Sequence, residues 1–156
     1  MIPGTLTIPP QLARQIEREG ARAFPNECCG ILFGRERRVD GAVERIVERL
    51  QPVANEFDSE ERFHRFLITP ASLLRAEKSA AAEGLVVLGF YHSHPNAPAR
   101  PSEYDRAHAW PFYSYVIVSV RDGRAEDMTS WTLDEQTQTF VAQPIARCAL
   151  ASRSTP

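Results

Sequence analysis

The chain has 156 residues, of which 43% are hydrophobic and 24% are charged, and its formal net charge is -2. These values are typical of one folded domain and exclude a disordered chain. A net charge so close to zero provides no basic surface for phosphate groups, so we expect no nucleic-acid partner.

The sequence shows no segment that would anchor or export the protein. Its longest apolar run, residues 85–91, is far too short to span a bilayer, and the first residues lack a charged segment followed by an apolar one. Cys28 and Cys29 are adjacent, and neighbouring cysteines seldom reach disulfide geometry. We therefore expect a cytoplasmic protein with reduced thiols and no membrane contact.

The first third of the chain alternates strand and helix patterns. Residues 5–8 predict a short strand, and the two prolines that follow can open a helix that ends around residues 20–24. The apolar run 28–33 and the segment 43–50 predict two antiparallel strands, which the Asp40-Gly41 pair joins as a hairpin turn.

The remainder of the chain also contains more strands than helices. The predicted elements are a helix over 69–83, a strand over 86–94, a short helix over 102–109, and strands over 115–120 and 130–139. Thr69 followed by Pro70 is a favourable helix start, and Gly84 closes that helix. Residues 55–65 are polar and without period, so we expect an exposed loop there that could carry function.

The segment from His92 to Asp105 contains the residues that indicate chemistry. His92 and His94 are two apart at the end of a predicted strand, so their imidazoles project from one face and can reach one metal ion. Three prolines then force a loop before a helix that starts near Ser102, and Asp105 lies on the first turn of that helix. Two imidazoles and one carboxylate leave tetrahedral zinc one position for water, as in catalytic sites.

Each of these residues also has a simpler interpretation. Ser102 and Asp105 fit an N-terminal capping box, with Asp in place of the usual Glu or Gln, and this can hold together with the metal interpretation. Glu27 alone would be read as a solvated loop acid. We interpret His64 and His108 as surface or helix residues rather than additional ligands.

Together the residues resemble the JAMM (MPN+) motif, which consists of an upstream Glu, then His-Ser-His-Pro, six residues, Ser, two residues and Asp. The matching positions are Glu27, His92, His94, Ser102 and Asp105. The resemblance covers most of the chain and is to the short, free-standing prokaryotic members of the family. It implies a single α/β domain over residues 1–146, with a curved, mixed, largely antiparallel sheet flanked by helices as in cytidine deaminases. Residues 147–156 are then a flexible tail.

The resemblance also implies a division of roles within the site. His92, His94 and Asp105 would hold one zinc ion per chain. Glu27 would act as the general base that takes a proton from the attacking water and passes it to the leaving amine. Ser102 would stabilise the scissile carbonyl as it becomes an oxyanion.

The same resemblance implies a protein substrate. The expected reaction is hydrolysis of a peptide or isopeptide bond after the C-terminal Gly-Gly of a ubiquitin-like or sulfur-carrier protein with a β-grasp fold. We expect the loop 55–65, with Phe57 and Phe63, to form part of the groove that receives this extended tail.

Two other functions remain open from the residues. A cysteine peptidase would use Cys28 or Cys29 as nucleophile, His92 or His94 as base and Asp105 to orient the imidazole. A non-catalytic interaction module of the same fold would have lost the metal site, and the complete set of motif residues argues against it. A zinc deaminase is excluded because the chain has no downstream Cys-x-x-Cys pair.

Overall fold

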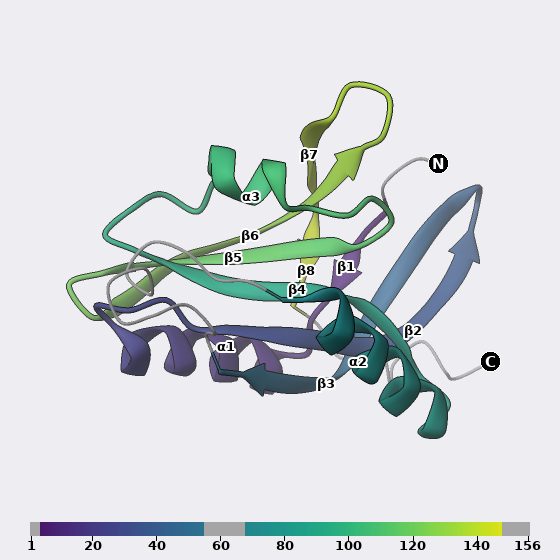
Figure 1. Ribbon diagram of the computed structural model, residues 1–156, viewed down its shortest axis with the longest axis horizontal. Coiled ribbons are helices and arrows are strands. Elements are labelled where there is room, and N and C mark those ends of the chain that lie inside the picture. Colours follow the sequence, from purple (N-terminus) through teal and green to yellow (C-terminus); the bar gives the residue numbers. More distant parts are fainter. Residues whose placement is uncertain (1–3, 55–67, 148–156) are drawn as a thin grey trace.

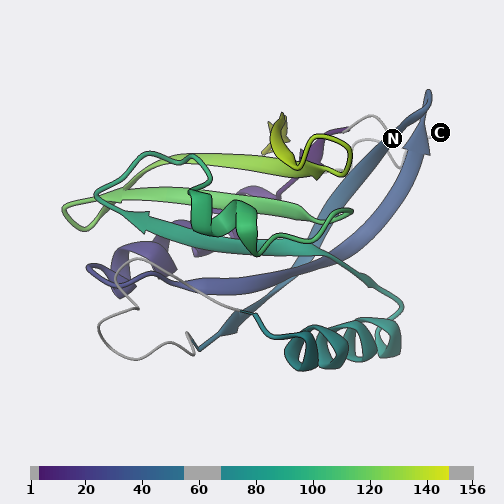
Figure 2. The ribbon, with the colours of Figure 1, turned by 45° about the horizontal axis from the view of Figure 1, so that its top comes forward.

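The computed structural model describes residues 4–54 and 68–147, which form a single domain around one curved sheet (Figures 1 and 2). The eight strands in these ranges are β1 (Leu6–Thr7), β2 (Cys29–Val39), β3 (Ala42–Val53), β4 (Val86–Pro95), β5 (Ser114–Arg121), β6 (Arg124–Asp134), β7 (Thr139–Gln143) and β8 (Ile145–Ala146). The helices are α1 (Pro10–Ala23), α2 (Pro70–Ala82) and α3 (Glu103–Ala107). None of these helices is long and apolar enough to cross a membrane.

The sheet is mixed, in the order β7-β6-β5-β4-β2-β3-β1-β8. The antiparallel pairs are β2 with β3, β2 with β4, β5 with β6, and β6 with β7, whereas β4 with β5 and both pairs of β1 are parallel. This confirms the predicted fold class, a curved, mixed and largely antiparallel sheet flanked by helices. Because β4 lies between β2 and β5, residues of its C-terminal half are shielded by neighbours on both sides.

Two Asp-Gly pairs form hairpin turns, of which only the first was predicted. Asp40 and Gly41 have φ values of 51° and 80°, as a turn with two left-handed residues requires, and they join β2 to β3 as predicted. Asp122 and Gly123, at 49° and 83°, make the same turn between β5 and β6. The predicted strand 130–139 is therefore wrong at both ends, because β6 already begins at Arg124 and the chain turns between Asp134 and Thr139.

The helix starts and stops follow the predicted chemistry. The Thr69 hydroxyl oxygen accepts the Ser72 N–H at 3.1 Å, Pro70 occupies the first position of α2, and Gly84 has φ 73° just after its end. The first helix also begins at a proline, Pro10, and ends at Ala23 as expected. The two-residue strand β8 was not predicted, because so short a segment has no period to detect.

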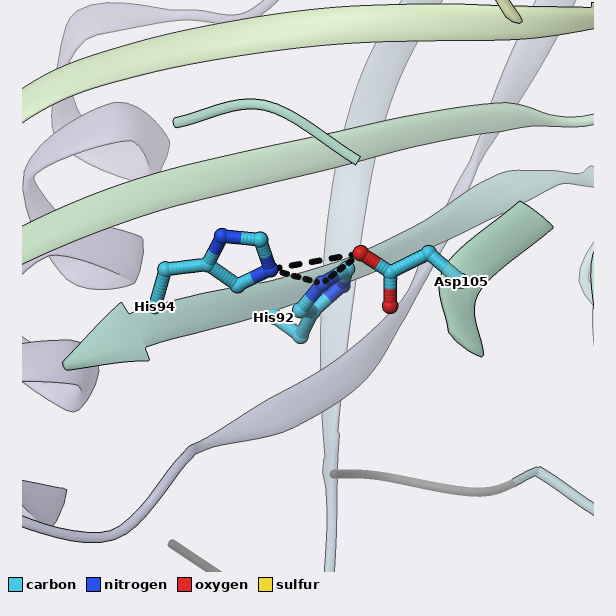
Figure 3. A group of neighbouring side chains, drawn as sticks. All are labelled: His92, His94 and Asp105. Carbon is cyan, nitrogen blue, oxygen red and sulfur yellow. Dashed lines mark hydrogen bonds and ion pairs between the residues drawn. The ribbon is translucent and has the colours of Figure 1, made fainter. Parts of the chain in front are cut away.

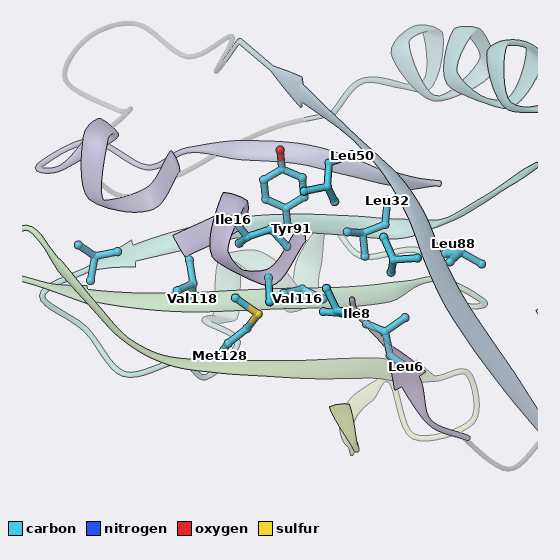
Figure 4. Packing of buried hydrophobic residues seen from close by; sticks show 13 residues of the cluster. Leu6, Ile8, Ile16, Leu32, Leu50, Leu88, Tyr91, Val116, Val118 and Met128 are labelled. Atoms are coloured by element: carbon cyan, nitrogen blue, oxygen red, sulfur yellow. The ribbon is translucent and has the colours of Figure 1, made fainter. Parts of the chain in front are cut away.

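The two faces of the sheet carry different layers. Helix α1 covers one face and packs into the larger hydrophobic cluster, which Figure 4 shows around Ile16, Tyr91 and Val116. Helix α2 contributes Ala76 and Ala80 to a second cluster on the other face. Figure 1 shows α3 on the side of the sheet opposite to α1. Even-numbered residues at the end of β4 therefore face α3, and odd-numbered ones face α1.

Candidate metal site

The C-terminal half of β4 presents two imidazoles to the face that α3 covers. His92 is paired with Cys29 of β2 and Ile117 of β5, and its side chain is only 1% exposed. His94 follows two residues later, and the two Nε2 atoms lie 3.1 Å apart (Figure 3). The spacing of two along a strand thus brings both rings to one point.

Asp105 completes this group from α3. Its Oδ2 lies 3.4 Å from His92 Nε2 and 3.3 Å from His94 Nε2 (Figure 3). Ser102 is the N-cap residue: its N–H donates to the same Oδ2 at 2.8 Å, and its Oγ accepts the Asp105 N–H at 3.0 Å. The predicted capping box is therefore present, and the same geometry directs the Asp105 carboxylate toward the two histidines.

The three candidate ligand atoms have the spacing that a zinc ion needs. Tetrahedral zinc with bonds of about 2.0–2.1 Å separates its ligand atoms by about 3.3 Å. The nitrogen–nitrogen distance of 3.1 Å and the two nitrogen–oxygen distances of 3.3 and 3.4 Å match that value. The group, which we call the triad, therefore fits a metal ion with one position left open.

A hydrogen bond outside the triad orients His94. Its Nδ1 lies 2.9 Å from the carbonyl oxygen of Pro98, which can only accept, so Nδ1 carries the proton and Nε2 offers its lone pair. The proline-rich loop that supplies this carbonyl is itself held in place. Asn96 donates its N–H to Val120 O at 2.6 Å, and the Thr129 hydroxyl donates to Ala99 O at 2.7 Å.

The protonation states also suit a metal. Burial opposes ionisation of Asp105, but the two imidazoles and the Ser102 N–H together hold the pKa of its carboxyl far below the usual range. Burial lowers the pKa of His92, so its imidazole is neutral at pH 7. A carboxylate and a neutral imidazole are the forms that coordinate metals.

Glu27 lies on the same face as the triad. The ladder between β2 and β4 reaches Cys29 and His92, and two hydrogen bonds between Cys28 and Ser93 continue it. Because side chains alternate along a strand, Glu27 shares the face of the two histidines and Cys28 shares the face of α1. Burial, together with the charge of Asp105, raises the pKa of the Glu27 carboxyl to about 9.

A small cavity adjoins the triad. Its volume is about 30 Å³, and its walls include His92 and Asp105 together with Phe90, Trp110 and Tyr115. The backbone N–H of Trp110 donates to the Tyr115 hydroxyl at 2.7 Å, which fixes the turn before β5. Trp110 carries no sequence signal of a site, because nothing in the spacing of residues 106–113 indicates that this segment returns to the histidines.

Comparison with known families decides what kind of domain this is. The family described as prokaryotic homologs of the JAB domain matches residues 9–134. The chain belongs to this family. The predicted membership of the JAMM/MPN group is thereby confirmed.

Two proteins with related sequences and one solved structure are similar to this JAB domain. A desampylase from Haloferax volcanii is 41% identical over 132 residues, which are 80% of this chain and 84% of the relative. A probable TtuB-protein conjugate cleaving protease from Thermus thermophilus is 35% identical over 120 residues, 77% of this chain and 74% of the relative. The solution structure of a Desulfitobacterium hafniense protein superposes with a TM-score of 0.75 at 31% identity, covering 94% of this chain and 96% of that one.

The cysteines of this JAB domain are poorly placed for nucleophilic catalysis. Cys28 packs against the α1 cluster, on the face opposite to His92 and His94. Burial raises the pKa of its thiol to about 11, which a hydrogen bond from Ser93 only partly offsets. Cys29 is buried and its Sγ donates to Val53 O at 3.3 Å. These positions argue against the cysteine peptidase alternative.

The remaining predicted features are two segments outside the described residues and one histidine at the end of α3. The loop 55–65, with Phe57, Phe63 and His64, lies outside the described residues, as do residues 148–156 of the predicted tail. His108 is exposed and its ring stacks on Tyr104 with centroids 4.0 Å apart, so it is a helix-end residue as interpreted from the sequence.

Proposed function

We propose that this JAB domain is a zinc-dependent hydrolase of protein conjugates. It would cleave the peptide or isopeptide bond that follows the C-terminal Gly-Gly of a ubiquitin-like or sulfur-carrier protein with a β-grasp fold. The observation that carries this proposal is the convergence of His92, His94 and Asp105 on the face that also holds the buried carboxyl of Glu27. The relative named for cleaving TtuB-protein conjugates supports the substrate class.

The triad would hold one zinc ion per chain. A zinc ion bound there would lower the pKa of a coordinated water to about 7 and polarise the scissile carbonyl. The residues around the triad keep the ligands ready for this: Pro98 fixes the tautomer of His94, and Ser102 aims Asp105.

Glu27 would move the proton. It lies on the face of the triad, and its buried Oε1 has no hydrogen-bond partner among residues 4–54 and 68–147, so this oxygen can accept from a water molecule. Glu27 ionises more readily beside a divalent cation, which brings its raised pKa toward the working pH of a general base. The ionised carboxylate takes a proton from the attacking water, and the carboxyl so formed delivers that proton to the leaving amine.

Ser102 would stabilise the negative charge on the substrate oxygen. Its Oγ accepts the Asp105 N–H, which leaves the hydroxyl proton available as a donor. The side chain of Ser102 is exposed at the start of α3, next to the Asp105 carboxylate of the triad. A donor in this position can meet the developing oxyanion without contacting the metal.

The proposal is tested with a β-grasp modifier that ends in Gly-Gly and is fused to a reporter peptide. We expect cleavage directly after the second glycine, loss of cleavage after chelation, and recovery when about one zinc per chain is added back. Matched substrates that end in Gly-Ala or Ala-Gly should be cleaved more slowly, because we propose that the tail lies in a narrow channel whose walls would meet any side chain. Equal rates would refute the Gly-Gly preference, and folded protein that binds no zinc in excess metal would refute the mechanism.

A further inference from the structure

Ser93 stands between the two histidines but points away from them. Its side chain is fully buried on the face of α1. Gly20 of α1 packs directly over it, since a Cβ at Gly20 would lie 3.3 Å from the Ser93 Cβ. The hydroxyl of Ser93 therefore reaches neither a substrate nor the triad, and its contribution must pass through another residue.

Ser93 forms hydrogen bonds with both the backbone N–H and the backbone carbonyl of Cys28. Its Oγ accepts the Cys28 N–H at 2.8 Å, and its own N–H donates to the Cys28 carbonyl at 3.2 Å. These two bonds lie beyond Cys29 and His92, the terminal pair of the ladder between β2 and β4. They extend the hydrogen bonding between β2 and β4 by one residue, Cys28, which directly follows Glu27 in the sequence.

The Glu27 carboxyl depends on this attachment for its position. Among the described parts of the chain, no residue hydrogen-bonds its buried Oε1, so no such bond fixes this oxygen. The backbone before it is tied by the Asn26 N–H, which donates to Ala23 O at 2.8 Å. The backbone after it is tied by Ser93. The backbone on each side of Glu27 is therefore hydrogen-bonded to a regular element: Asn26 to α1 and Cys28 to β4.

We propose that Ser93 is a positioning residue that holds the Cys28 backbone and thereby aims the Glu27 carboxyl at the reacting water. This inference rests on the proposed role of Glu27 as general base. A shift of about 1 Å in a catalytic group can lower a rate by about a hundredfold, so a single lost backbone bond has a measurable consequence.

The kinetic test compares Ser93→Ala in two backgrounds, using the zinc-loaded full chain and the Gly-Gly fusion. In the wild-type background we expect kcat to fall by about tenfold or more, with KM and zinc content unchanged. In the Glu27→Gln background the same substitution should change kcat by less than about twofold, because no base is left to position. Ser93→Thr, which keeps the hydroxyl, should retain more activity than Ser93→Ala.

Ser130→Ala is the matched control. Ser130 is also a buried strand serine, and its hydroxyl donates to Gln143 Oε1 at 2.8 Å, but it lies on β6, two strands from β4. Its loss should change kcat by less than about twofold in either background. Equal losses from Ser93→Ala in both backgrounds, or loss of zinc, would show a general structural effect and overturn the inference.

A measurement without turnover separates this inference from the proposed function. In metal-free protein, Ser93→Ala should speed hydrogen exchange of the Cys28 amide and shift the NMR resonance of the Glu27 side-chain carboxyl carbon, whereas Ser130→Ala should do neither. If the wild type cleaved no conjugate, the proposed function would fail, and these two signals would still decide whether Ser93 positions Glu27. An unchanged Glu27 resonance in Ser93→Ala would contradict it.

Discussion

The two faces of β4 serve different purposes although their residues alternate along one strand. Tyr91 faces α1 and the larger apolar cluster, whose side chains Figure 4 shows around it. His92 and His94 face the opposite layer, where Figure 3 shows polar atoms directed at one another. The helices that cover the two faces also differ in length, since α1 has 14 residues and α3 has five.

This difference shows how the fold separates stability from chemistry. Apolar side chains buried under α1 contribute the hydrophobic free energy of folding. The face under α3 carries groups that are costly to bury, including the Glu27 carboxyl with its pKa of about 9. A short capped helix and a proline-rich loop cover those groups, and a small cavity adjoins them. The comparison predicts that removing an apolar side chain from the α1 face mainly lowers stability, whereas removing a metal ligand from the α3 face abolishes metal binding.

The largest stability effect is expected on the α1 face. Leu32→Ala removes a fully buried side chain from the larger cluster and should lower the free energy of unfolding by about 2–5 kcal/mol, measured by urea denaturation. His92→Ala, on the α3 face, should instead lose zinc while still unfolding in one cooperative transition. The separation of faces would be wrong if Leu32→Ala changed stability by less than about 1 kcal/mol.

A second test concerns the hydroxyl of Ser102. Ser102→Ala should lower kcat by about a hundredfold, the scale for loss of one oxyanion donor, with a smaller change in zinc affinity. Because Ser102 also caps α3, Ser102→Gly serves as control, since glycine at this position costs the helix only a few tenths of a kcal/mol. If Ser102→Gly kept its activity while Ser102→Ala lost it, the cap rather than the hydroxyl would explain the effect.

The pH dependence of stability probes the buried carboxyl directly. In metal-free protein Glu27 binds its proton more tightly than in the unfolded chain, because its pKa is raised from 4.5 to about 9. Its contribution to stability is therefore complete below pH 4.5 and is lost as the pH rises toward about 9. Since Gln does not ionise, the Tm of Glu27→Gln should rise relative to wild type across this window. A Tm difference that stays constant with pH would show that the carboxyl is not desolvated.

The smallest effect is expected from the cysteine next to Glu27. Cys28→Ser keeps the backbone bonds to Ser93 and should change kcat by no more than a few fold, because its thiol faces α1 and has a raised pKa. Cys29→Ser, made separately, should likewise remain active. A folded but inactive Cys28→Ser or Cys29→Ser enzyme would instead support thiol chemistry.

Local signals in the sequence were sufficient for many elements. Thr69 and Gly84 predicted the bounds of α2, and the Asp40-Gly41 pair predicted the first hairpin. The start of β6 was missed although Asp122-Gly123 repeats that signal, because most of residues 124–127 are exposed and carry no apolar pattern. The grouping of the triad followed from two spacings, which are local: two residues along a strand and three along a helix turn.

The parts of the site that could not be predicted depend on contacts between distant segments. Pro98 orients His94 through a carbonyl that any residue would supply, so its identity gives no signal. The bonds between Ser93 and Cys28 join residues 65 apart in sequence. Trp110 reaches the cavity only because the chain returns to the sheet at β5. Such contacts are fixed by tertiary packing rather than by residue spacing.

The central claim is that Glu27 moves the proton while His92, His94 and Asp105 hold the metal. The most direct measurement compares wild type with Glu27→Gln at equal, measured zinc content, using single-turnover cleavage of the Gly-Gly fusion. Glu27→Gln keeps the size of the side chain and removes its basicity, so we predict unchanged zinc binding and a rate lower by about a hundredfold or more. A Glu27→Gln enzyme that cleaves as fast as wild type would contradict the account.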